Sequence, residues 1–96
     1  MIIAIAEIEI NLPYCQSLKD KRRIIKSLID SLGKKNNISI REINYRDLWQ
    51  RSLLGITSIC DNTNSAQRFL DRIKNKIYEK EGTRIIRFIS SIHSTE

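Results

Sequence analysis

Two short segments of the sequence combine cations with groups that could recognise an anionic partner. The first, Ser17–Arg23, places two lysines and two arginines directly after a serine. The second, Arg46–Arg51, has an arginine at each end and contains the only tryptophan, Trp49. Arginine and lysine bind phosphate and carboxylate groups through charge-assisted hydrogen bonds, and an exposed tryptophan stacks on a nucleobase. The chemistry indicated is binding of a polyanion.

The net charge of the chain agrees with an anionic partner but does not show which kind. Lysine and arginine number 17 against 11 aspartates and glutamates, which gives a formal charge of +6. A basic surplus favours RNA, acidic lipid or an acidic protein as partner. Basic composition that merely keeps a small protein soluble explains the same surplus.

Residues that catalyse reactions or bind metals are sparse. Cys15 and Cys60 form no CxxC pair and His93 is the only histidine, which disfavours a standard zinc site. No glycine-rich phosphate loop precedes a predicted helix, and no catalytic triad can be assembled. We therefore predict that the protein is not an enzyme and has no cofactor and no metal site. An enzyme or small-anion sensor that uses the start of the first helix remains the least favoured alternative.

The elements that must position these residues follow from hydrophobic periodicity. Alternating apolar residues predict strands, and an amphipathic pattern predicts two helices, the first begun by the capping-box pattern of Ser17 and Asp20. The predicted order is strand 2–12, helix 17–33, strand 38–45, strand 52–60, helix to about residue 80, and strand 83–93. This βαββαβ order predicts one α+β domain over residues 1–96. Its expected architecture is a ferredoxin-like sandwich, a four-stranded antiparallel sheet with two helices on one face.

This topology brings residues that are distant in sequence to one end of the domain. The first helix starts where the first strand ends, and the hairpin between the second and third strands turns at the same end. We call this region the basic end and predict that it binds RNA or another anion. Its expected members are Ser17, Lys19, Lys21, Arg22, Arg46, Trp49, Gln50 and Arg51, with Arg84 beside them.

Two members of the basic end have alternative interpretations. Lys21 falls on the apolar stripe that contains Ile25 and Leu28, so its ammonium group must extend past the edge of the sheet. The alternative to an anion site is an ordinary solvated turn that is partly paired with Asp20. We expect Trp49 to fold back over the hairpin and pack against the neighbouring helix, and an exposed anchor is the alternative.

Apolar residues are also expected on the sheet face away from the helices. An exposed patch of this kind usually marks an interface, so the prediction is a homodimer formed through the open sheet face. The alternative is that a β-bulge shifts the strand by one residue and hides some of these side chains. The predicted interface residues are Ile3, Ile5, Leu53, Ile59, Ile85 and Ile89.

The segments Ser17–Arg23 and Asp47–Arg51 resemble signature blocks of the bacterial YlxP-like family, also known as domain of unknown function 503. Leu12-Pro13 before the first block and Gly55 after the second also fit, and the similarity covers about residues 1–90. The resemblance implies a ferredoxin-like fold. Genes of the family often neighbour translation-initiation and ribosome-maturation genes, so it also implies RNA or the ribosome as a partner.

The chain shows no signal for export or membrane insertion. No apolar stretch is long enough for a membrane span, and the apolar first segment lacks a basic start. We expect a cytoplasmic protein with no membrane partner. Its two cysteines should be reduced, and the predicted topology places them too far apart for a disulfide.

Overall fold

A computed structural model of the protein describes residues 1–33 and 37–95. Its elements follow the predicted βαββαβ order, with boundaries within a few residues of the predicted ones. They are β1 (Ile2–Asn11), α1 (Leu18–Leu32), β2 (Ile38–Asn44), β3 (Arg51–Cys60), α2 (Thr63–Glu79) and β4 (Arg84–Ser94).

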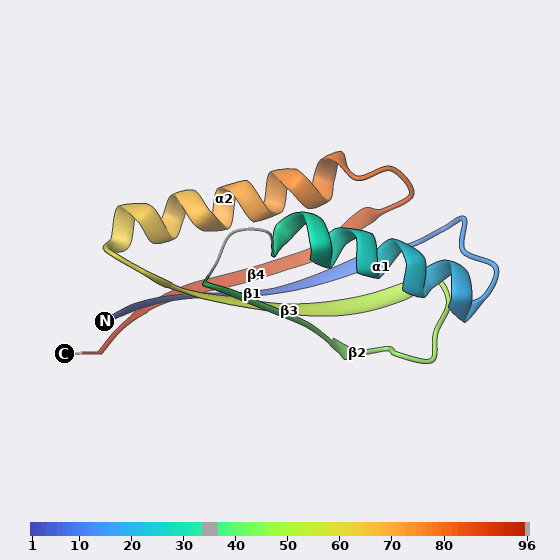
Figure 1. Ribbon diagram of the computed structural model, residues 1–96, viewed down its shortest axis with the longest axis horizontal. Coiled ribbons are helices and arrows are strands. Elements are labelled where there is room, and N and C mark those ends of the chain that lie inside the picture. The colour runs from blue at the N-terminus through green and yellow to red at the C-terminus, as the bar shows by residue number, and fades with distance from the viewer. Residues whose placement is uncertain (34–36, 96) are drawn as a thin grey trace.

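The strands form one antiparallel sheet in the order β2-β3-β1-β4. Both helices lie on the same face of this sheet, and the other face is open (Figure 1). Each helix connects two strands that are not neighbours in the sheet, as the ferredoxin-like topology requires. The predicted fold class is confirmed.

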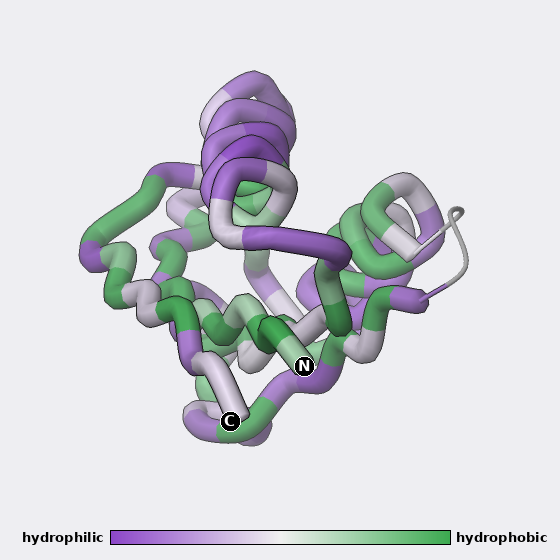
Figure 2. Tube along the Cα trace, turned by 90° about the vertical axis from the view of Figure 1, so that its left-hand side faces the viewer, coloured by the Kyte–Doolittle hydropathy of each residue, from purple (hydrophilic) through white to green (hydrophobic). Residues whose placement is uncertain are grey.

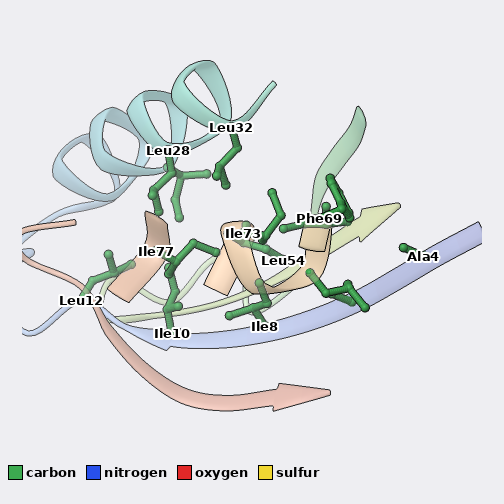
Figure 3. Close-up of a cluster of buried hydrophobic side chains, with 14 of the residues drawn as sticks. Ala4, Ile8, Ile10, Leu12, Leu28, Leu32, Leu54, Phe69, Ile73 and Ile77 are labelled. Carbon is green, nitrogen blue, oxygen red and sulfur yellow. The ribbon is translucent and has the colours of Figure 1, made fainter. Parts of the chain in front are cut away.

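The core lies between the sheet and the two helices. Alternate residues of β1 are buried on the helix side, because side chains of a strand point to opposite faces at every second position. Figure 3 shows leucines of α1 and isoleucines of α2 directed toward these strand residues. Hydrophilic residues lie on the outward side of α2 (Figure 2). The labelled core residues are Ala4, Ile8, Ile10, Leu12, Leu28, Leu32, Leu54, Phe69, Ile73 and Ile77.

Side-chain caps determine where both helices begin. At the start of α1, the Ser17 Oγ accepts the backbone N–H of Asp20 at 3.1 Å, as predicted. The Asp20 carboxylate accepts the N–H of Gln16 and not that of Ser17, so the expected reciprocal bond is absent. At the start of α2, Asn62 and Ser65 form a complete capping box. Neither described helix combines the length and apolar character needed for a membrane span.

A bulge in β4 corrects one predicted interface residue. Ile85 lies opposite Ile10, and Arg87 lies opposite Glu9, the residue before Ile10 in β1. Ile86 therefore has no partner in β1 and is the extra residue of the bulge. The bulge turns Ile85 onto the helix side, where it packs against the core, and leaves Ile86 54% exposed. The prediction that Ile85 belongs to the open face was wrong, and the alternative of a one-residue shift is confirmed at this strand.

Exchanging either isoleucine for serine tests this register. We expect Ile85→Ser to lower the free energy of unfolding by about 2 kcal/mol, because it removes apolar area from the core. Ile86→Ser should change it by less than about 0.5 kcal/mol, as is usual for an exposed position. Urea denaturation followed by circular dichroism measures both. Equal effects, or a larger effect at Ile86, would contradict the bulge.

Candidate functional site

The first turn of α1 and the β2–β3 hairpin meet at one end of the domain, on the right in Figure 1. The backbone N–H of Leu12 donates to the Gln50 carbonyl at 2.9 Å. The Gln50 side-chain amide donates to the Cys15 carbonyl at 3.0 Å, next to the start of α1. Residues about 35 positions apart are therefore hydrogen-bonded, and the predicted convergence at the basic end is confirmed.

Lys21 is the centre of this contact and is almost completely buried, with 1% of its surface exposed. Its Nζ pairs with Glu42 Oε2 at 2.8 Å. It also donates to the carbonyl oxygens of Tyr45 at 2.5 Å and Arg46 at 3.4 Å. An ammonium group has three donors, and these three acceptors use them all. Lys21 therefore holds the hairpin against α1 and has no donor left for a ligand.

The carboxylate that neutralises Lys21 is also held from the sheet. Ser52 is fully buried, and its Oγ donates to Glu42 Oε2 at 2.6 Å. No described residue donates to the other oxygen, Glu42 Oε1. Since no buried side-chain oxygen among the described residues lacks a partner, Oε1 must be in contact with solvent. Glu42 thus keeps one acceptor available on the outside.

The hairpin has a fixed shape next to Lys21. Tyr45 has a φ of 61°, in the left-handed region that few side chains adopt. Asn44 Oδ1 accepts the Tyr45 N–H at 2.8 Å, and Lys21 binds the Tyr45 carbonyl, so both peptide groups of this turn are held. The Arg46 guanidinium donates to the Glu42 carbonyl at 3.1 Å. These contacts determine where Arg46 and the following Asp47 lie.

Arg51 occupies a different surface from Lys21. It precedes the buried Ser52 on β3, so it belongs to the open face of the sheet. Its guanidinium pairs with the Glu9 carboxylate at 2.8 Å and lies over the Tyr45 ring, 4.0 Å from the ring centroid. The structure therefore separates Arg51 from the predicted cations of α1 and neutralises it.

A pocket of about 410 Å³ lies between α1, β2 and the hairpin. We call it the α1–β2 pocket. Its volume is in the range of sites that bind small molecules. Apolar side chains of α1, cations of both α1 and the hairpin, and two carboxylates surround it. The lining residues are Lys21, Arg22, Ile25, Lys26, Ile29, Glu42, Arg46 and Asp47.

Three predicted members of the basic end are exposed where they were expected. Lys19 and Arg22 are exposed on α1, and Arg46 is exposed in the hairpin. Among the described residues, none of them forms an ion pair with a carboxylate. Arg84, opposite Asn11 at the same end, is exposed as well.

The remaining predicted members have structural contacts or an unexpected exposure. Ser17 caps α1, and Gln50 binds the carbonyls before α1, so both use their polar atoms within the protein. Trp49 is 51% exposed, so the expectation that it packs against a helix was wrong. Its neighbour Leu48 and Tyr14, in the loop after β1, are also exposed. The basic end therefore presents apolar groups together with its cations.

Sequence reasoning missed three charged residues of the pocket, Lys26, Glu42 and Asp47. Lys26 is four residues after Arg22, a spacing that places both on one side of a helix, so this residue could have been found. Asp47 begins the second signature block, but it was assigned no role. Glu42 carried no signal, because its partners Lys21 and Ser52 come from other elements.

The two cysteines are free. Burial raises the pKa of the Cys15 thiol, and the nearby Asp20 carboxylate raises it further, while Lys21 lowers it. The thiol is therefore protonated at neutral pH and is a poor nucleophile. No group of three potential metal ligands occurs in the part of the chain that the structure describes.

Comparison with known proteins connects this architecture to a family. The family described as "Protein of unknown function (DUF503)" matches residues 3–89. The chain belongs to this family. The "Uncharacterized protein YlxP" of Bacillus subtilis (strain 168) is 35% identical over 72 residues, which span 75% of this chain and 78% of that protein. The predicted YlxP-like resemblance is confirmed.

Solved structures similar to this DUF503 protein share its fold. The de novo designed protein Foldit4 has a TM-score of 0.56 and 15% sequence identity, with 98% of this chain and 99% of that chain covered. A C-terminal segment of the alpha subunit of aIF2 from Pyrococcus abyssi has a TM-score of 0.53 and 16% identity, with 98% and 50% covered. At these identities the likeness shows the architecture alone.

Replacing Lys21 tests whether its role is structural. We expect Lys21→Met to lower the free energy of unfolding by about 3 kcal/mol, because it leaves the Glu42 carboxylate without its cation in a partly buried site. Adding Glu42→Gln should restore about half of that loss, since the amide oxygen still accepts from Ser52 and no unpaired charge remains. Denaturant titration measures both variants. A double variant no more stable than the single one would contradict this role.

Proposed function

We propose that this protein is a non-enzymatic accessory protein that binds RNA, alone or within a ribosomal particle, through its basic end. The observation that carries the proposal is a group of cations that the fold gathers but does not neutralise. Lys19, Arg22 and Lys26 come from α1, and Arg46 comes from the hairpin. All four are exposed, and no described carboxylate pairs with them.

The contacts within the protein divide the predicted binding residues by role. Lys21 and Arg51 are paired with carboxylates, so they support the basic end rather than bind phosphate. Lys19, Arg22, Lys26 and Arg46 are the phosphate-binding candidates. The half-exposed Trp49 supplies an aromatic surface on which an unpaired base could stack.

The proposal also includes a partner and a cellular location. A ribosomal partner and a cytoplasmic location agree with the family resemblance and with the basic, partly aromatic surface. RNA without a strong sequence requirement is the partner class favoured, because exposed cations bind backbone phosphates of any sequence.

Charge reversal at Arg22 tests the proposal. Binding of a labelled single-stranded RNA oligonucleotide, measured by fluorescence anisotropy, should weaken steeply between about 50 and 200 mM salt because counterions are released. Arg22→Glu should weaken binding about tenfold at the lower salt concentration and reduce the salt dependence.

The matched control is Arg68→Glu, which makes the same charge change at an exposed position of α2. Arg68 follows the start of α2, at the opposite end of the domain from the first turn of α1 (Figure 1). We expect less than about a twofold change, since long-range charge effects are screened. Equal losses in both variants would mean that only net charge matters. Absent or salt-independent binding would contradict the proposal.

The open sheet face favours a second candidate function, a homodimeric structural or regulatory module. Ile5, Ile59 and Ile89 lie on this face and remain exposed, and Ile3 and Leu53 lie among them partly buried. Ile43 of β2 adds to the patch, since a side chain at Gly55 would meet it at 3.2 Å. Polar residues lie among these apolar side chains, since Ile5 is flanked by Thr57 and Ser91 and Ile89 is paired with Glu7. Exposed apolar side chains gathered on one face are typical of interfaces. This face lies opposite the helices and leaves the α1–β2 pocket uncovered.

A charge on this face tests the second candidate. We expect light scattering to give a dimeric mass for the wild type at high protein concentration and a monomeric mass for Ile89→Glu, because a buried unpaired carboxylate destabilises an interface. Ile86→Glu, at the exposed bulge of the same strand, is the control and should leave the dimer intact. A monomeric wild type would remove this candidate.

A further inference from the structure

The α1–β2 pocket has a charge that suits a phosphate monoester. Lys21 and Glu42 neutralise each other at its inner wall. The remaining charged groups are three cations, Arg22, Lys26 and Arg46, against the single carboxylate of Asp47. The surplus of two positive charges matches the charge of about −2 that a phosphate monoester carries near neutral pH. The cations come from two elements, so they can approach a phosphate from two sides.

The same pocket has an apolar wall. Ile25 and Ile29 are one turn apart on α1 and both line the pocket; Ile25 is 7% exposed, so the partly buried Ile29 supplies most of the accessible aliphatic surface. Arg22 and Lys26 flank it on the same helix. An apolar wall next to cations suits a ligand with a flat apolar face and an attached phosphate. A nucleotide has this combination, and the pocket volume of about 410 Å³ can accommodate one.

The carboxylates of the pocket specify which base is favoured. Glu42 Oε1 accepts no hydrogen bond from a described residue and is in contact with solvent. The exposed Asp47 carboxylate likewise has no partner among the described residues. Carboxylates only accept, so they select a base edge with adjacent donors. Guanine has two such donors, N1–H and the N2 amine, whereas the single N3–H of uracil lies between two carbonyls that would face the carboxylates.

We propose that the α1–β2 pocket binds a guanine nucleotide. Asp47 and Glu42 Oε1 accept from the Watson–Crick edge, the base packs on Ile25 and Ile29, and Arg22, Lys26 and Arg46 bind the phosphate. The inference rests on the proposed function in one respect, because the guanosine would be an unpaired residue of the bound RNA. The same chemistry would also be met by a free guanine nucleotide.

Calorimetric titration with nucleoside monophosphates tests base selection directly. Guanosine and inosine monophosphates differ only in the N2 amine, so they form a matched pair of probes. We expect guanosine monophosphate to bind about tenfold more tightly than inosine monophosphate, and uridine monophosphate to bind more weakly still. Equal binding of the three monophosphates would mean that the pocket recognises only the phosphate. If none of the three binds, the pocket is not a nucleotide site. Either result overturns the inference.

Substitution of Asp47 tests whether its carboxylate accepts hydrogen bonds from the guanine base. Asp47→Asn should abolish most of the preference for guanosine over inosine monophosphate. Asp61→Asn, which removes another exposed carboxylate at the other end of the domain, is the control and should keep the preference. Circular dichroism confirms that both variants fold. An unchanged preference in Asp47→Asn would overturn the assignment of this residue.

Binding of oligonucleotides distinguishes a failure of this inference from a failure of the proposed function. It also distinguishes a guanosine within RNA from a free nucleotide as the occupant of the pocket. If oligouridine binds with a strong salt dependence but guanosine monophosphate does not bind, the RNA-binding function stands and the guanine pocket fails. If neither binds, both fail. Tighter binding of an oligouridine that contains one guanosine, lost in Asp47→Asn, would identify an RNA residue as the occupant. Binding of the monophosphate alone would assign the pocket to a free nucleotide.

Discussion

The buried ammonium group of Lys21 is the contact on which the rest of the basic end depends. A charge removed from water must be paired and hydrogen-bonded, or the fold does not tolerate it. Lys21 meets this requirement only with acceptors from β2 and the hairpin, namely Glu42 Oε2 and the carbonyls of Tyr45 and Arg46. The first turns of α1 are therefore tied to the hairpin. Together with the hydrogen bonds of Gln50 to Leu12 and Cys15, this contact holds the two basic segments against each other.

The same contact explains why the count of cations is a poor guide to binding capacity. Lys21 and Arg51 belong to the basic segments, but Glu42 and Glu9 neutralise them. Their role is to hold the hairpin and to order the Tyr45 ring on the open face. The cations of these segments that stay exposed include Arg22 and Arg46, which line the pocket, and Lys19, which does not. Each ion pair contains one cation and one carboxylate, so the net charge of +6 is unchanged, and only the positions of the unpaired cations differ from the simple count.

The two surfaces that the fold leaves available are on different sides of the molecule. The α1–β2 pocket lies on the helix side, next to the edge strand β2. The exposed isoleucines lie on the opposite face of the sheet, where Ile5 of the central strand β1 is flanked by β3 and β4. Association of two copies through the sheet would leave both pockets open. The two candidate functions are therefore compatible with each other.

Much of this protein is determined by local sequence. The capping serine Ser17, the alternation in β1 and the amphipathic pattern of both helices are set by neighbours within a few residues, so element order and fold class could be predicted. The placement of the basic end also followed, because topology alone brings the start of α1 to the hairpin. Both segments lie within residues 3–89, which match the DUF503 family.

Tertiary structure decided which side chains are available. The bulge that buries Ile85 depends on pairing with β1, and the exposure of Trp49 depends on what the neighbouring elements leave uncovered. The neutral state of the Lys21 site depends on Glu42 of β2, which Ser52 of β3 holds by a hydrogen bond, and the pocket forms only where α1, β2 and the hairpin meet. Hydrophobic periodicity indicates which face of a helix or strand is apolar. It does not indicate which residue pairs with a charged side chain, because that pairing depends on contacts between elements that are distant in the sequence.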